Sequence, residues 1–100
     1  ATPQLDFERI KQLRAALDIP LVMHGCSDIP TDQLQKTVEL GFSKYNIATE
    51  YDRAFYQVLS KHMKEDGKNA HSPNLEAMEE EMIAFVRSKM QILNPNHVTL

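Results

Sequence analysis

Apolar and polar positions alternate along the first forty residues in a way that predicts two helices with a strand between them. In residues 6–17 the apolar side chains recur every three or four positions, which is the spacing of one helix face. Asp6 is the predicted N-cap of this helix, and Pro20 follows its end. The run Leu21–His24 is short, apolar and bounded by proline and glycine, so it predicts a buried strand. Residues 30–40 predict the second helix, which Gly41 terminates.

A second strand and two longer helices follow. Residues 44–47 predict the strand, and residues 49–64 predict a helix. The inner face of that helix is predicted to hold Phe55, Val58, Leu59 and His62. The polar stretch 65–72 predicts a linker, and a C-terminal helix over residues 73–94 comes after it, with Ser72 as its N-cap and Pro73 at its first position.

The order of these elements predicts an α/β fold with a parallel pair of strands. Two strands joined through a helix are almost always parallel, with a right-handed crossover. A parallel pair leaves both of its outer edges unpaired, whereas stable sheets usually contain three or more strands. We therefore expect residues 1–100 to form one partial domain of a larger sheet, and the isolated chain to associate or to fold loosely.

Composition narrows the class of protein. The chain has 100 residues, enough for one small domain, and a formal net charge of −3 without a basic stripe, which argues against nucleic acid as a partner. Every apolar run is far shorter than a membrane span, so no membrane partner is expected. The single cysteine, Cys26, excludes an internal disulfide and is typical of a reducing compartment, so we expect a cytoplasmic protein.

Candidate chemistry follows the two predicted strands. In α/β proteins, ligands bind beyond the carboxyl ends of the strands. Small and polar residues occupy that place after each strand: His24, Gly25, Cys26 and Ser27 after the first, and Asn46, Ile47, Ala48 and Thr49 after the second. Backbone N–H groups, two hydroxyls and the N-terminus of the helix that begins near Thr49 are suited to hold a phosphate. The alternative is that both stretches contain only turn and cap residues.

The other polar residues have simpler interpretations. A catalytic zinc site needs three protein ligands, and His62, His71 and His97 show no ligand spacing with His24. The methionines of the last helix are expected in packing contacts. Glu79, Glu80 and Glu81 predict a solvated helix face.

The stretch LDFERIKQLRAALDIPLVMHGCSDIPTDQLQKTVELGFSKYNIATEYDRAF, residues 5–55, resembles the C-terminal region of the zinc-dependent class II ketose-bisphosphate aldolases. The resemblance is specific because two separate motifs, HGCSD and NIATE, occur at matching spacing. Asp28 and the sequence NIATE are more similar to the tagatose-bisphosphate branch than to the fructose-bisphosphate branch. Cys26 departs from the family, which usually has alanine or glycine there, and an acidic run stands at 79–81, where relatives often carry basic residues nearby.

The resemblance implies a fold and a set of roles. The chain would be the C-terminal quarter of a (β/α)₈ barrel, comprising its last two βα units with flanking and C-terminal helices. His24 would be one zinc ligand. One half of a phosphate site would be Gly25, Cys26 and Ser27, and the other half Asn46, Ile47, Ala48 and Thr49. The family cleaves a ketose 1,6-bisphosphate reversibly into dihydroxyacetone phosphate and glyceraldehyde 3-phosphate, and zinc stabilises the enediolate.

The resemblance also implies that this chain lacks part of the machinery. In the family, the other zinc ligands and the proton-donating aspartate come from earlier strands, so we assign no acid or base among these 100 residues. The chain by itself is predicted to be inactive and to act within an oligomer or together with the N-terminal part of the barrel. The alternative is a non-catalytic remnant that serves as an interaction or phosphate-binding module.

Overall fold

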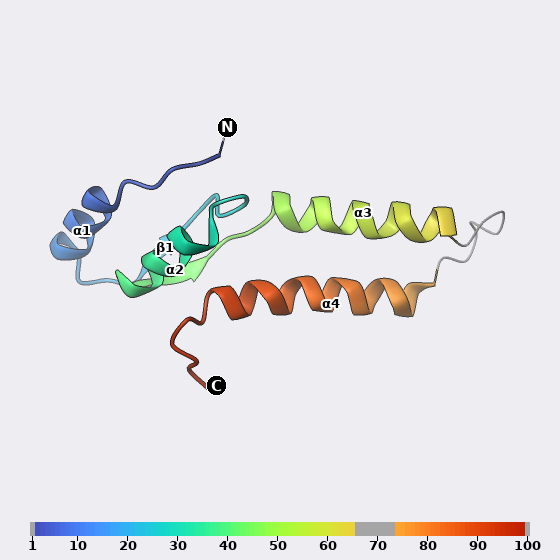
Figure 1. Ribbon diagram of the computed structural model, residues 1–100. Helices are drawn as coiled ribbons and strands as arrows, with labels where there is room; N and C mark the ends of the chain where they lie inside the picture. The colour runs from blue at the N-terminus through green and yellow to red at the C-terminus, as the bar shows by residue number, and fades with distance from the viewer. Residues whose placement is uncertain (1, 66–73, 100) are drawn as a thin grey trace.

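The computed structural model describes residues 2–65 and 74–99, and within them the chain forms four helices and two strands. The helices and strands appear in the predicted order, and an extended pair of helices projects from a smaller α/β part (Figure 1). In chain order the elements are α1 (Phe7–Ala16), β1 (Leu21–Met23), α2 (Thr31–Glu39), β2 (Phe42–Tyr45), α3 (Thr49–Glu65) and α4 (Leu75–Ile92).

Local cap signals set the ends of the first two helices. The Asp6 side chain accepts the Arg9 N–H at 3.0 Å, which confirms the predicted N-cap of α1. At the end of α2, Gly41 has a φ of +102° and so adopts the left-handed conformation that favours glycine. A Cβ at this glycine would lie 2.9 Å from Cδ of Arg14, so α1 also packs closely against this turn.

The strands β1 and β2 pair in parallel, and α2 crosses between them. The second strand was predicted at residues 44–47 but runs over Phe42–Tyr45, because it begins directly after the Gly41 turn. The first strand ends at Met23, one residue earlier than predicted. The register shifts between Leu21 and Val22, which is an irregularity of the bulge type.

The core lies where the sheet, α2 and the end of α4 meet. Its buried apolar members are Cys26, Ile29 and Leu34, and Met23 and Tyr45 from the strands pack against them. Thr37 is also buried, and its hydroxyl bonds both the Leu34 carbonyl and the Tyr45 hydroxyl. A buried hydroxyl needs such partners, because an unsatisfied polar group in a core is destabilising.

Helices α3 and α4 lie side by side and antiparallel (Figure 1). His62 of α3 is buried as predicted, whereas Phe55 remains 39% exposed, so its predicted place on the inner face is wrong. The His62 Nε2 lies 3.0 Å from one carboxylate oxygen of Glu81, and the Lys61 ammonium donates to the other oxygen. The solvated acidic face therefore comprises Glu79 and Glu80 but excludes Glu81, whose pKa is lowered by Lys61 and then His62.

The start of α4 also differs from the prediction. Its N-cap is Asn74, whose side chain accepts the Ala77 N–H at 3.1 Å, and the helix begins at Leu75. The predicted cap Ser72, the following Pro73 and most of the predicted linker lie outside the described residues.

The described part of the chain leaves much apolar surface uncovered. Its sheet has only the strands β1 and β2, so both outer edges lack a neighbouring strand there. Thirteen large apolar side chains are exposed in the described residues, among them Val22 on β1 and Met90 on α4. One groove beside β2 is lined by Ile83, Val86, Met90 and Val98, and apolar surface gathered in this way is suited to contacts with further polypeptide. None of the described helices is long and apolar enough to cross a membrane.

The core predicts a sharp contrast between two leucine substitutions in helices. Leu34 is 1% exposed in α2, and Leu75 is 68% exposed at the start of α4. We expect Leu34→Ala to lower the free energy of unfolding by about 2–5 kcal/mol, because it leaves a cavity in a small core. Leu75→Ala should change it by less than about 0.5 kcal/mol. Urea denaturation followed by circular dichroism measures both, and equal effects would contradict this description of the core.

Candidate functional site

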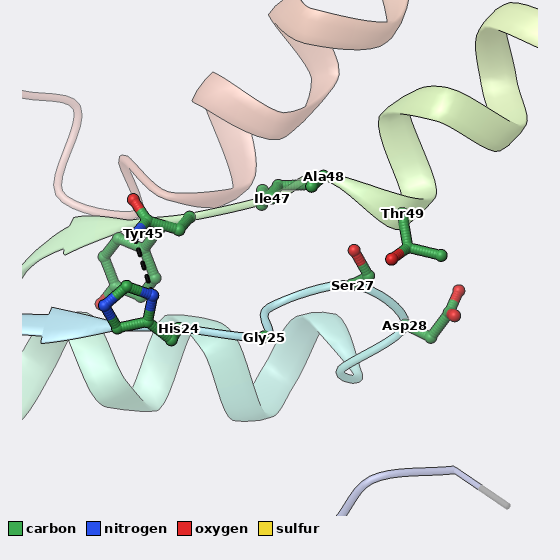
Figure 2. A pocket seen from close by; sticks show the side chains of 9 residues that line it. His24, Gly25, Ser27, Asp28, Tyr45, Ile47, Ala48 and Thr49 are labelled. Carbon is green, nitrogen blue, oxygen red and sulfur yellow. Dashed lines mark hydrogen bonds between the residues drawn. The ribbon is translucent and has the colours of Figure 1, made fainter.

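A pocket of about 660 Å³ opens at the carboxyl ends of β1 and β2, and the loops after both strands line it (Figure 2). The lining residues are His24, Gly25, Ser27, Asp28, Tyr45, Asn46, Ile47, Ala48 and Thr49. The structure thus brings together the two stretches that the sequence singled out, with one exception, Cys26. Tyr45 and Asp28 line the pocket as well, although the sequence had not placed them in the site.

Backbone hydrogen bonds hold the two loops against each other. The Asn46 N–H donates to the Met23 carbonyl at 2.9 Å, and the Asn46 carbonyl accepts the Cys26 N–H at 3.3 Å. These bonds extend the parallel pairing beyond the last strand residues. The first loop is therefore fixed relative to the second at its base, before any side chain contributes.

Cys26 has a structural role in this arrangement. Its side chain is 1% exposed in the core, and its thiol donates to the Met23 carbonyl at 3.1 Å. Burial raises the pKa of the thiol, which disfavours the nucleophilic thiolate. Because the Cys26 N–H is already bonded to Asn46, a phosphate contact through that N–H would require this bond to break.

The His24 imidazole is exposed and is oriented by one neighbour. Its Nδ1 lies 3.1 Å from Nδ2 of Asn46, across the two loops. When the amide donates to Nδ1, the proton of the neutral imidazole resides on Nε2. A metal on Nε2 would require the Asn46 amide to turn its oxygen toward an Nδ1–H, which is the usual partner of a metal-bound histidine.

Ser27 joins the first loop to the N-terminus of α3. Its Oγ accepts the Glu50 N–H at 3.1 Å, so it satisfies one of the free N–H groups in the first turn of the helix. Figure 2 shows Ser27, Asp28 and Thr49 together at one end of the pocket, and His24 and Tyr45 at the other. The hydroxyl groups and the positive end of the helix dipole thus share the same end, which favours an anion there.

Two carboxylates lie beside this end of the pocket, and each has a cationic partner. Asp28, at a φ of +63°, accepts two bonds from the Arg53 guanidinium at 2.9 and 3.1 Å. Glu50 pairs with Lys89 of α4 and accepts the Asp28 N–H at 3.4 Å. Arg53, Glu50 and Lys89 were missed by sequence reasoning, because no local spacing connects groups that are far apart in the chain.

The Asp28–Arg53 pair affects the titration of both groups. The hydrogen bond from Arg53 lowers the pKa of Asp28, and the same bond raises the pKa of Arg53. Because the pKa of Asp28 is lowered, the pair contributes its full stabilisation to the fold at pH values above the ordinary carboxyl range. That stabilisation is lost as the pH falls through the lowered pKa. The pair is therefore ionised at neutral pH.

The metal ligands present in the described residues do not form a zinc site by themselves. No group of three His, Cys, Asp or Glu side chains in residues 2–65 and 74–99 is arranged to hold a metal ion. His24 lines the pocket, but His62 is buried between α3 and α4, and His97 lies near the C-terminal end. The predicted loop residue His71 lies outside the described residues. The pocket therefore offers one imidazole where a catalytic zinc needs three ligands.

A comparison with protein families agrees with the strand-end geometry. The family model described as fructose-bisphosphate aldolase class-II matches residues 1–97, almost the whole chain. The fold of the described residues, an α/β arrangement with a parallel pair of strands and polar loops at their carboxyl ends, is consistent with part of such an enzyme. The chain therefore belongs to the class II fructose-bisphosphate aldolase family.

Proposed function

We propose that this chain supplies the phosphate-binding part of a class II aldolase active site. Its family cleaves sugar bisphosphates by an aldol-type reaction, which makes the chain part of a lyase. The observation that carries the proposal is the meeting of two hydroxyls, Ser27 and Thr49, with the N-terminus of α3 at one end of the strand-end pocket. The substrate would be a ketose 1,6-bisphosphate, and the products dihydroxyacetone phosphate and glyceraldehyde 3-phosphate.

The phosphate would bind to donors from both loops. The Ser27 oxygen accepts the Glu50 N–H, so its own O–H remains able to donate to a phosphate oxygen. Thr49 offers a second hydroxyl at the first helical position. Gly25 has a φ of +66° with open space around its missing side chain, so a ligand can approach the backbone. Asn46, Ile47 and Ala48 complete the second half of the site, whereas Cys26 would hold the first loop in place, because its N–H is already bonded to the Asn46 carbonyl.

His24 would be one ligand of a zinc ion whose other ligands are contributed from outside these residues. The support is its exposed imidazole at the opposite end of the pocket from the hydroxyls, with Asn46 as an orienting neighbour. In class II aldolases the zinc, when bound, supplies a Lewis acid for the substrate ketone. We assign the chain's own residues to binding and orientation, and none to acid or base catalysis.

Two features support tagatose bisphosphate as the substrate within this family. Asp28 and the NIATE sequence are similar to the tagatose branch. Asp28 also lines the pocket and is held by Arg53, so the position that marks the branch lies beside the proposed phosphate. A specificity for the tagatose epimer is therefore part of the proposal.

The fold supports a place at the end of a (β/α)₈ barrel. β1 and β2 with the crossover α2 and the following α3 have the order of two consecutive βα units. The unpaired edges of this sheet and the exposed apolar side chains are suited to the remaining strands and helices of a barrel. The working partner would be that remaining portion or an oligomer, in a cytoplasmic enzyme.

A second candidate function is a phosphate-binding or interaction module without catalysis. One observation favours it: the groups suited to a phosphate lie within the described residues, whereas a three-ligand metal site does not. The two candidates differ in whether added barrel segments restore turnover.

Phosphate binding should be detectable in the chain itself. On addition of dihydroxyacetone phosphate we expect the amide resonances of residues 25–27 and 46–49 to shift, with weak affinity because the ligand must order two surface loops. Two-dimensional NMR of the labelled 100-residue chain measures this, and dihydroxyacetone without phosphate serves as the control. Shifts confined to other residues would refute this placement of the site.

The 100-residue chain by itself should show no turnover of ketose bisphosphates. One imidazole cannot hold a catalytic zinc, and a missing acid group commonly lowers the rate by a further factor of about 10² or more. A coupled assay for triose phosphate release, with zinc present, measures this. Turnover that a chelator abolishes would contradict the proposal.

The complementary experiment supplies the missing segments. The N-terminal barrel portion of a tagatose-type relative, added as a separate polypeptide, should restore activity, and His24→Ala in this chain should then abolish it. His97→Ala is the matched control, since this histidine lies outside the pocket, and it should leave the restored activity unchanged. Equal activity of the His24→Ala and His97→Ala variants would show that His24 is not a ligand.

A further inference from the structure

The charges around the phosphate end of the pocket present an electrostatic problem. Asp28 lines the pocket, and Glu50 donates its N–H to Ser27 and therefore lies directly behind the hydroxyl. A phosphate monoester carries about −1.5 to −2 charges at pH 7. In water at about 4 Å, a unit negative charge weakens binding about fivefold for each negative charge on the phosphate. An unneutralised carboxylate at Asp28 would therefore oppose the proposed ligand.

The Arg53 guanidinium on helix α3 pairs with the Asp28 carboxylate. Both terminal nitrogens of Arg53 donate to the two oxygens of Asp28, which is the bidentate geometry that fixes a carboxylate most firmly. The pair links the first loop to α3 across 25 positions of the chain. The second carboxylate, Glu50, pairs through one of its oxygens with the Lys89 ammonium of α4.

We propose that Arg53 is a positioning residue that keeps the pocket receptive to phosphate by neutralising Asp28 and fixing its carboxylate against α3. The inference rests on the proposed phosphate site and adds the residue that sets its electrostatic potential. Arg53 acts through Asp28 and does not itself contact the phosphate, because it is not among the residues that line the pocket and both of its terminal nitrogens are directed at the carboxylate. The ligand class is a phosphate monoester or another tetrahedral dianion.

A double-substitution experiment separates this role from the alternatives. The probe is inorganic phosphate, titrated at low ionic strength into the labelled 100-residue chain and into Arg53→Gln, Asp28→Asn and the double variant. Asparagine is chosen because it tolerates the positive φ of Asp28 better than most residues. We expect Arg53→Gln to bind at least about fivefold more weakly, because it exposes the Asp28 charge. The double variant should recover most of that loss, and Asp28→Asn should bind at least as tightly as the unaltered chain.

Two controls identify the effect as local and electrostatic. Arg9→Gln removes the same charge from the exposed face of α1, away from the pocket-lining residues, and should leave the affinity unchanged. The deficit of Arg53→Gln should shrink as salt is raised, because salt screens exposed charges. A purely structural bridge would show neither recovery in the double variant nor this dependence on salt.

The titrations can overturn either the role of Arg53 or the phosphate site itself. A double variant as weak as Arg53→Gln would overturn the proposal, since it would indicate a direct phosphate contact or a structural bridge. Unchanged affinity in Arg53→Gln, or loss of its circular dichroism spectrum, would overturn it as well. If phosphate fails to move the pocket resonances of the unaltered chain, the phosphate site itself fails and the inference with it. If the unaltered chain binds and the variants behave alike, only the inference fails.

Discussion

The backbone bonds of Asn46 are the constraint on which the site depends. Its N–H and its carbonyl bond Met23 and Cys26, one on each side of the point where β1 ends. These two bonds hold the strand-end loops in register. The second loop leads directly into α3, so Ser27 of the first loop reaches the N-terminus of that helix. The same residue orients His24 through its side chain. Without this pairing the polar groups would belong to two independent turns.

The core explains both why this pairing holds and why it needs support. Cys26 and Leu34 bury their side chains beneath the loops. Burial of the Cys26 side chain fixes the position of its own N–H, which bonds the Asn46 carbonyl. The enclosed cluster is small, however, and the sheet above it has free edges in the described residues. Small cores supply little net stability, and unpaired strand edges invite further pairing. The exposed apolar side chains support the proposal that further polypeptide packs against this part of the chain.

Local chemistry in the sequence was sufficient for much of the fold. Asp6 as a cap, Gly41 as a terminator and the order of the elements followed from short-range rules, and the strand-end motifs indicated where polar groups would gather. The start of β2 was missed because Phe42 follows its glycine turn directly, with no polar spacer. Exposure of Phe55 was not predictable, because helix periodicity does not say which part of an apolar face the neighbouring helix covers.

The ion pairs and side-chain directions of the site could not be predicted from the sequence, because they depend on the folded structure. Asp28 and Arg53 are 25 positions apart, and only the folded loop brings them together. Cys26 occupies a position within a loop motif, yet its side chain points into the core, a choice that depends on the packing beneath it. The partner of His62 on α4 could not be predicted either. Glu81 belongs to a run of three glutamates, and the sequence does not show which of the three contacts the histidine.

The most direct measurement of the central claim, that the two strand-end loops form one anion site, is anomalous diffraction from crystals grown with selenate. Selenate is a tetrahedral dianion like phosphate, and the anomalous scattering of its selenium atom identifies its position in the crystal. We expect a peak within hydrogen-bond distance of the Ser27 and Thr49 hydroxyls, at the N-terminus of α3. Crystals with selenate bound elsewhere and that position empty would contradict it.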